Sequence, residues 1–149
     1  LTGCGSSDSD STASGGSGGS GKKASGGDED HVQEIFGMLS DRYVNKNIPC
    51  YLGEFGCSMR SKSDSRAWAF YLYYMEYVVK AAKTFGLPCF VWDNGGSDAG
   101  QEQHGYIHHG TGNYLGNGGE VVAVMRKAWT NGNESYTLQS VFNSAPKFN

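Results

Sequence analysis

The sequence predicts an α/β fold, in which helices cover a parallel sheet, for everything after an irregular leader. Two short apolar runs that end in Gly, at Ile48–Gly56 and Leu87–Gly95, are typical of buried strands. The two runs match position by position in residue character and lie 39 residues apart, which indicates a repeated supersecondary unit. Amphipathic segments precede both runs and follow the second, and such alternation favours parallel strands connected by helices.

The leader occupies residues 1–30, of which seventeen are Gly or Ser. Such a segment cannot bury enough apolar surface to offset the entropy lost on ordering, so we expect a flexible, disordered linker. The composition becomes that of a globular protein from about His31. We therefore expect one folded unit over residues 31–149.

The first four residues, Leu1-Thr2-Gly3-Cys4, resemble the lipobox of bacterial lipoproteins, in which the Cys is acylated. The resemblance implies a lipid anchor at Cys4 and a secreted or cell-surface location in a bacterium. The signal peptide of such a protein would precede Leu1. The alternative is a chance match within a Gly/Ser-rich end.

Three helices are expected from apolar residues at helical spacing. The first contains Val32 and Tyr43. The second begins at a cap provided by Ser63 or Ser65 and ends at Gly86, and the third covers about 119–129. The segment at 136–142 fits either a short helix or an extended tail.

Composition excludes several classes of function. The net charge of -3 provides no basic surface for nucleic acid, and no apolar run approaches the ~18 residues that span a membrane. The chain contains no C-x-x-C motif, and the adjacent His108 and His109 suit neither a helix face nor a strand face as metal ligands. We expect no metal and no cofactor. For His104, His108 and His109 the alternatives are binding of a hydroxyl group or an ordinary place in a loop.

Glu54 is the sharpest candidate for chemistry, because it lies at the carboxyl end of a predicted buried strand, where α/β proteins place their sites. The alternative is a Glu that simply leaves the strand into solvent. Strict alternation predicts that Cys50, Leu52 and Glu54 share one face of the first strand.

In the second strand, alternation groups Phe90, Trp92 and Asn94, and it directs Cys89 to the opposite face. It therefore predicts that Cys50 and Cys89 point to opposite faces as small buried hydrophobes. A Trp beside a carboxylate can serve as a platform for a sugar ring. The alternative is that Trp92 belongs to the core.

The two strand motifs resemble those of family 5 glycoside hydrolases of the endoglucanase type. IPCYLGEFG, at 48–56, looks like their seventh strand, and LPCFVWDNG, at 87–95, looks like their eighth. The resemblance covers roughly residues 29–149 and implies part of a (β/α)8 TIM barrel. It implies that Glu54 is the catalytic nucleophile. It also implies that Trp92 lines the sugar subsite next to the cleaved bond and that Asn94 contacts sugar hydroxyls.

The departures from the family pattern are large. Only the last two strands have counterparts here, and the Asn-Glu pair of the fourth strand, which provides the general acid/base, has none. His108 and His109 stand where the family often has an Asp-Arg-like pair, and we expect His108 to contact substrate.

The resemblance therefore implies hydrolysis of β-1,4-glucosidic bonds in cellulose or a related β-glucan by a retaining mechanism. It implies the carboxyl-terminal part of such an enzyme, inactive alone. The inner strand face (Cys50, Leu52, Phe90 and Trp92) would be exposed and would promote self-association. The alternative function is a non-catalytic, cell-surface remnant that binds polysaccharide through Trp92.

Overall fold

The computed structural model describes residues 29–147. The elements, in chain order, are α1 (Glu29–Arg42), a short 3₁₀ turn η1 (Val44–Lys46), β1 (Leu52–Phe55), α2 (Ser65–Thr84), β2 (Cys89–Val91), α3 (Gly118–Thr130) and α4 (Leu138–Asn143). The expected leader, with the motif that ends at Cys4, lies outside the described residues except for Glu29 and Asp30, which begin α1. In the described part, no helix has the length and apolarity needed to cross a membrane.

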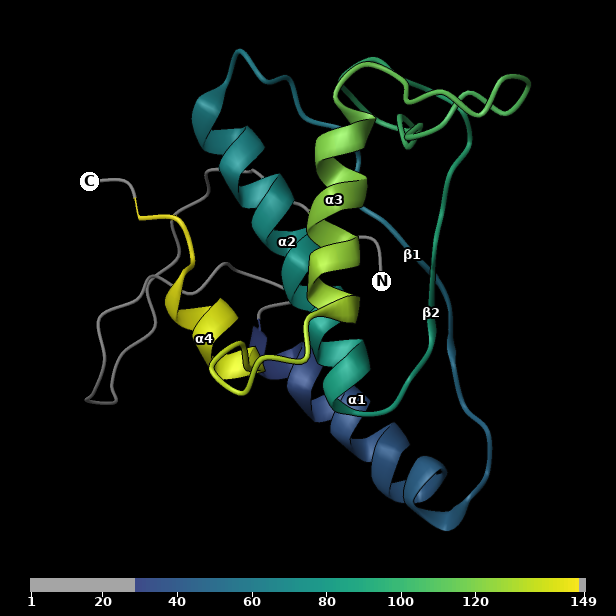
Figure 1. Ribbon diagram of the computed structural model, residues 1–149, viewed down its shortest axis with the longest axis vertical. Helices are drawn as coiled ribbons and strands as arrows, with labels where there is room; N and C mark the ends of the chain where they lie inside the picture. Colours follow the sequence, from purple (N-terminus) through teal and green to yellow (C-terminus); the bar gives the residue numbers. More distant parts are fainter. Residues whose placement is uncertain (1–28, 148–149) are drawn as a thin grey trace, which may run out of the picture.

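The strands β1 and β2 are parallel neighbours, and the helices lie to one side of them (Figure 1). The core is centred on α2, whose buried residues include Trp68, Tyr71, Met75 and Val78. Helix α3 packs along α2 and contributes the fully buried Val121. The order of helices and strands, and their parallel pairing, confirm the α/β prediction.

The structure corrects the expected N-cap of α2. The N-cap is Asp64, not Ser63 or Ser65: its carboxylate accepts a hydrogen bond of 2.9 Å from the backbone N–H of Ala67. A carboxylate suits this position because it also interacts favourably with the positive end of the helix dipole. At the other end, Gly86 adopts φ of +72°, as expected for a residue that ends a helix before an X-Pro pair.

The segment after α3 contains a short helix, α4, and is not the extended tail that was the alternative. Thr137 and Ser140 form a capping box, with bonds of 3.1 Å from the Ser140 N–H to the Thr137 hydroxyl and 2.9 Å from the Thr137 N–H to the Ser140 hydroxyl. Leu138 and Val141 are buried, so α4 docks on the body beside α2 (Figure 1).

The strand register breaks strict alternation. Leu52 pairs with Cys89 and Phe55 pairs with Val91, so three steps along β1 match two steps along β2. The extra residue lies between Leu52 and Phe55, where β1 has an irregularity of the bulge type. Leu52 and Phe55 therefore both face the helical core, and Glu54 is exposed.

The predicted faces are wrong in two respects as a result. Cys50 and Leu52 do not share the face of Glu54, and Cys50 and Cys89 do not lie on opposite faces. Instead, both cysteines pack against the helical core. Burial raises the pKa of the Cys89 thiol to about 11, so this sulfur is a poor nucleophile at neutral pH.

At the start of α3, Gly118 lies very close to the backbone of Tyr106, and this contact predicts the effect of a substitution on stability. A Cβ added at the buried Gly118 would overlap the backbone of Tyr106. Gly118→Ala should therefore destabilise the chain by about 1–3 kcal/mol, although helix propensity alone would favour Ala by ~0.5–1 kcal/mol. Urea unfolding measures the difference. Gly132→Ala, where the Cβ meets open space, is the control, and equal effects of the two substitutions would contradict the packing argument.

Candidate active site at the carboxyl ends of the strands

The structure brings Glu54 and Trp92 to the same edge of the sheet. Because β1 and β2 are parallel, their carboxyl ends meet there, with Glu54 near the end of β1 and Trp92 directly after β2. Phe55 and Val91 are register partners that face the helices, so the alternating neighbours Glu54 and Trp92 point to the other, open face. Trp92 is 45% exposed and does not belong to the core.

The Glu54 carboxylate is solvent-exposed. Among residues 29–147, no side chain forms a hydrogen bond or ion pair with it. This exposure is compatible with both alternatives, a Glu that simply leaves the strand into solvent and a Glu that does chemistry, so the role of Glu54 stays a prediction. A carboxylate that no other side chain binds is available to attack a bound substrate.

Asn94 is engaged with the loop that follows β2. Its Oδ1 accepts hydrogen bonds from the N–H groups of Gly96, at 3.0 Å, and His104, at 3.1 Å. Its Nδ2 donates to the carbonyl of Glu102 at 2.6 Å. The side-chain amide thus closes the loop on itself, and its contact with sugar hydroxyls stays a prediction.

Asp93, which strict alternation places on the strand face opposite Trp92, organises the same loop. Its carboxylate accepts hydrogen bonds from the N–H groups of Gly95, at 2.9 Å, and of Tyr106 and Ile107, both at 3.2 Å. His109 Nε2 lies 3.3 Å from it. Burial alone would raise the pKa of Asp93, but these bonds outweigh it, and the pKa lies below its ordinary value. The only sequence signal was an Asp directly before an Asn-Gly-Gly turn.

Asp93→Asn should destabilise the chain by about 1–3 kcal/mol at pH 7, because several backbone donors lose a charged acceptor. Since the folded pKa is lowered, this contribution exists above the unfolded pKa of ~3.9 and disappears as the pH falls through the folded value. Urea unfolding at pH 7 and at pH 3 should show the gap between wild type and variant shrinking. Asp98→Asn, at an exposed position of the same loop, should have little effect at either pH.

The three histidines do not gather at one place. His104 is 6% exposed, and its Nδ1 has no hydrogen-bond partner among the described residues. Nδ1 of the exposed His108 lies 3.0 Å from the hydroxyl of Thr111, and Nε2 of His109 lies 3.3 Å from the carboxylate of Asp93. Within residues 29–147, no three His, Cys, Asp or Glu side chains are arranged to hold a metal ion. The contact of His108 with substrate stays a prediction.

The two loops at this edge are fastened to each other and to α2. The N–H of Met59 donates to the carbonyl of Gln103 at 2.7 Å, and the hydroxyl of Tyr74 donates to the carbonyl of Gly56 at 3.2 Å. The buried Tyr71 and Tyr106 hydroxyls are 3.5 Å apart. These anchors hold the backbone that follows Glu54 and Trp92 in a defined position.

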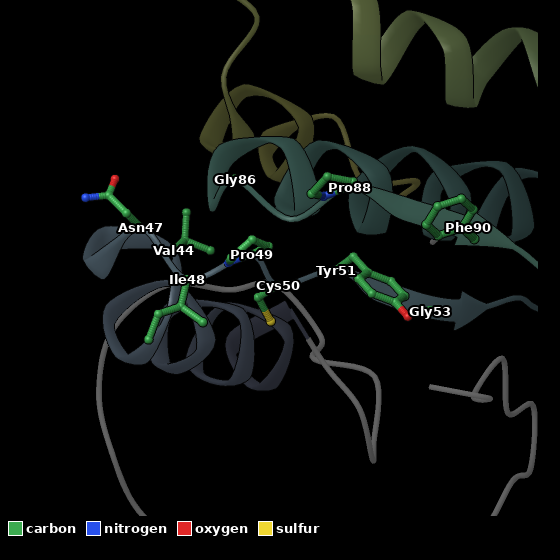
Figure 2. A pocket seen from close by; sticks show the side chains of 10 residues that line it. All are labelled: Val44, Asn47, Ile48, Pro49, Cys50, Tyr51, Gly53, Gly86, Pro88 and Phe90. Carbon is green, nitrogen blue, oxygen red and sulfur yellow. The ribbon is translucent and has the colours of Figure 1, made fainter.

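An apolar groove of about 750 Å³ lies at the opposite end of the strands (Figure 2). It is lined by residues at the amino ends of β1 and β2, including Ile48, Tyr51, Gly53, Pro88 and Phe90. We call it the amino-end groove. Neither Glu54 nor Trp92 lines it, so this groove and the candidate chemistry are separate features.

The family model "Cellulase (glycosyl hydrolase family 5)" matches residues 9–98, a range that contains both strands and the helix between them. The chain belongs to glycosyl hydrolase family 5. Endoglucanase B of Neocallimastix patriciarum is 32% identical over 85 residues, which make up 56% of this chain and 17% of that protein. The resemblance that the two strand motifs indicated is therefore confirmed.

Solved structures of the family share the fold. A Bacteroidetes-affiliated GH5 cellulase linked with a polysaccharide utilization locus is 36% identical with a TM-score of 0.79, and the match covers 83% of this chain and 31% of that one. A GH5-4 broad specificity endoglucanase from Bacteroides salanitronis is 41% identical with a TM-score of 0.67, covering 72% and 28%. The chain thus forms part of a (β/α)8 barrel and spans less than a third of these relatives.

Proposed function

We propose that this chain provides the nucleophile and one sugar-binding surface for the hydrolysis of β-1,4-glucan by a retaining mechanism. The observation that carries the proposal is the common placement of Glu54 and Trp92. Both lie on the open face of the sheet, at its carboxyl edge, in a chain of a cellulase family. That edge is where barrel enzymes hold their catalytic groups.

In the proposed reaction, the Glu54 carboxylate attacks the anomeric carbon and forms a glycosyl ester. The bond from that carbon to the leaving oxygen breaks, and the leaving oxygen takes a proton from a second carboxyl group. Water then attacks the same carbon and gives a proton back to that group, while the bond between the carbon and the Glu54 oxygen breaks. This step regenerates the Glu54 carboxylate and releases the sugar with its original configuration. The two carboxyl groups must lie ~5–5.5 Å apart.

The second carboxyl group is proposed to come from another barrel strand. Several acids of this chain are held elsewhere by their own partners. Glu76 receives hydrogen bonds from Lys127 and Tyr136, of 3.0 and 2.6 Å. Glu120 pairs with Lys62, and Asp93 holds the loop. The chain alone is therefore proposed to be inactive.

The test uses a hybrid barrel: the full chain co-produced with the remainder of the Bacteroides salanitronis endoglucanase, without the segment that this chain matches. Incubated with cellotetraose, the hybrid barrel should release sugars whose new reducing ends are first β and then mutarotate, as proton NMR can follow. Initial release of the α anomer, or a completed barrel that releases no sugar, would overturn the proposal.

Trp92 is proposed as the platform for a glucose ring. In the hybrid barrel, Trp92→Ala should lower kcat/KM about tenfold, equivalent to ~1.4 kcal/mol, because the apolar face of the sugar loses a large aromatic partner. Trp129→Ala is the matched control, since Trp129 is 39% exposed on α3, away from the strands. Equal kinetics for the two variants would contradict the role of Trp92.

A second candidate function is favoured by the 45% exposure of Trp92 in the chain alone. In this case the chain binds polysaccharide without cleaving it, held at a cell surface by lipid on Cys4. Sedimentation with insoluble cellulose tests it. The full chain and its Trp129→Ala variant should bind, whereas Trp92→Ala should remain in solution. Failure of the full chain to sediment would remove this candidate.

A further inference from the structure

We propose that His104 is a positioning residue for the candidate site. Its imidazole ring packs against Gly56, where the ends of β1 and β2 meet, and it holds the backbone that carries Glu54 and Trp92 by its shape and not by a hydrogen bond. The placement of the two strand ends is a property of this chain. Its effect on hydrolysis rests on the proposed function.

The first support is the contact between His104 and the end of β1. A Cβ built on Gly56 would lie 3.2 Å from Nδ1 of His104, and the same Cβ would lie 3.7 Å from Cβ of Trp92. The imidazole ring and the Trp92 side chain therefore both pack against one backbone position. The N–H of Trp92 also donates to the carbonyl of Phe55 at 2.8 Å, which joins the two strand ends directly.

The second support is that the loop after β2 fixes the position of His104. The N–H of His104 donates to Oδ1 of Asn94 at 3.1 Å. The N–H of the next residue, Gly105, donates to the carbonyl of Gly96, and a Cβ added at Gly105 would overlap the backbone of Gly96. The backbone around His104 is therefore held against the turn that follows β2, and the ring cannot move away from Gly56 without breaking these contacts.

The third support is that Nδ1 of His104 makes no hydrogen bond. His104 is 6% exposed, and within residues 29–147 this nitrogen has neither a donor nor an acceptor as a partner. A buried polar atom without a partner costs free energy, so a hydrogen bond through Nδ1 is not what keeps the ring at this point. The flat ring instead fills the space that a side chain at position 56 would take, which favours a role of shape.

The contact bears on chemistry because Gly56 follows Glu54 by only two residues. The carbonyl of Gly56 accepts a hydrogen bond of 3.2 Å from the Tyr74 hydroxyl, so this backbone is held by α2 through Tyr74 and by the loop through His104. Loss of the ring would let the ends of β1 and β2 move relative to each other. A misplacement of ~1 Å between catalytic groups and substrate can cost about 10²-fold in rate.

The first experiment uses the full chain labelled with fluorotryptophan. Its three Trp signals in fluorine NMR are assigned by replacing each Trp with Phe in turn. His104→Ala should broaden the Trp92 signal about twofold or more and leave the signal of Trp129, on α3, unchanged. His31→Ala, at an exposed histidine on α1, is the matched control and should leave all three line widths unchanged. An unchanged Trp92 line width in His104→Ala would overturn the proposal.

Two further variants separate shape from hydrogen bonding and guard against a variant that fails to fold. His104→Phe keeps a flat ring without nitrogen and should keep the wild-type line width of Trp92. His104→Gln keeps polar atoms without a ring and should broaden the signal as His104→Ala does. Circular dichroism verifies that the helices persist in each variant. A narrow Trp92 signal with Gln, or a broad one with Phe, would overturn the role of shape.

Gly56→Ala tests the contact from the other side. The added methyl group would lie 3.2 Å from Nδ1 of His104, which is closer than ordinary packing allows. Gly56→Ala alone should therefore broaden the Trp92 signal. In combination with His104→Ala, which provides room for the methyl group, it should add little further broadening, because residues in direct contact have coupled effects. Additive broadening by the two substitutions would contradict the contact.

The second experiment measures hydrolysis of cellotetraose by the hybrid barrel. His104→Ala should raise KM and lower kcat/KM about tenfold, because Glu54 and Trp92 no longer meet the sugar together. His104→Phe should keep wild-type values. A variant that merely lost stability would contain less active enzyme at an unchanged KM, so an unchanged KM would overturn the positioning role. If Trp92→Ala leaves the kinetics unchanged, the proposed function fails, whereas the line width of Trp92 in the chain alone still decides the placement by His104.

Discussion

Glu54→Gln should reduce glucan hydrolysis by the hybrid barrel by more than about 10³-fold, the scale on which loss of a covalent nucleophile acts. Glutamine keeps the size and planarity of the side chain but lacks the negative charge that attacks the anomeric carbon. Because Glu54 is exposed and pairs with no described side chain, the substitution should not disturb folding. Release of reducing sugar from carboxymethylcellulose measures the effect.

Glu102→Gln provides the matched control for Glu54. Glu102 is an exposed carboxylate in the loop after β2, at the same edge of the sheet, and its backbone carbonyl is what Asn94 binds. We expect this variant to keep nearly full activity. The assignment of the nucleophile to Glu54 would be wrong if the Glu54→Gln enzyme retained more than about a hundredth of its activity, or if the Glu102→Gln enzyme lost its activity.

The full chain by itself should show no hydrolysis above the blank under conditions in which the hybrid barrel is active. Protonation of the leaving oxygen, worth roughly 10²–10⁴-fold, needs a second carboxyl group near Glu54. Positioning of the sugar, which also contributes strongly, needs the other walls of the cleft. The open face of the sheet supplies neither. The same reducing-sugar assay, before and after the remaining barrel strands are provided, measures the difference.

One outcome would contradict this prediction directly. Turnover by the purified chain alone that Glu54→Gln removes would show that another residue of this chain acts as the acid. Glu102 would then be the first residue to test, since its loop lies at the same edge and its side chain is exposed. Turnover unaffected by Glu54→Gln would instead indicate a contaminating glucanase.

Much of the fold follows from local patterns in the sequence. Residues such as Phe36 on α1 and Met75 on α2 recur on one helical face, as this periodicity predicts, and both are buried. Tyr43, which the same periodicity assigned to the first helix, is an exception, because it follows the end of α1 and is 40% exposed. The match between the runs around Leu52 and Phe90 correctly predicts two equivalent, parallel strands. Glu54 and Trp92 were identified because strand ends in α/β proteins converge on one edge, a rule of topology that requires no coordinates.

The remaining features depend on contacts between distant residues, which local periodicity does not contain. The register shift between Leu52 and Phe55 sends both residues to the same face, because the segment of β1 between them is one residue longer than the segment of β2 with which it pairs. Alternation counted along β1 alone therefore misassigned Cys50 and Leu52. Asp93 was passed over for a similar reason, since two of its donors, Tyr106 and Ile107, lie more than ten residues away.

By itself, the sequence determined the order and type of the elements, the family, and the edge of the sheet at which chemistry is expected. These features depend on residue type and spacing within short segments, where each helix or strand must present an apolar face. Only the tertiary structure decided which strand face is covered by helices and which is left open, and how the loop after β2 is held. Those outcomes depend on the register between two strands and on hydrogen bonds that close only when the chain has folded.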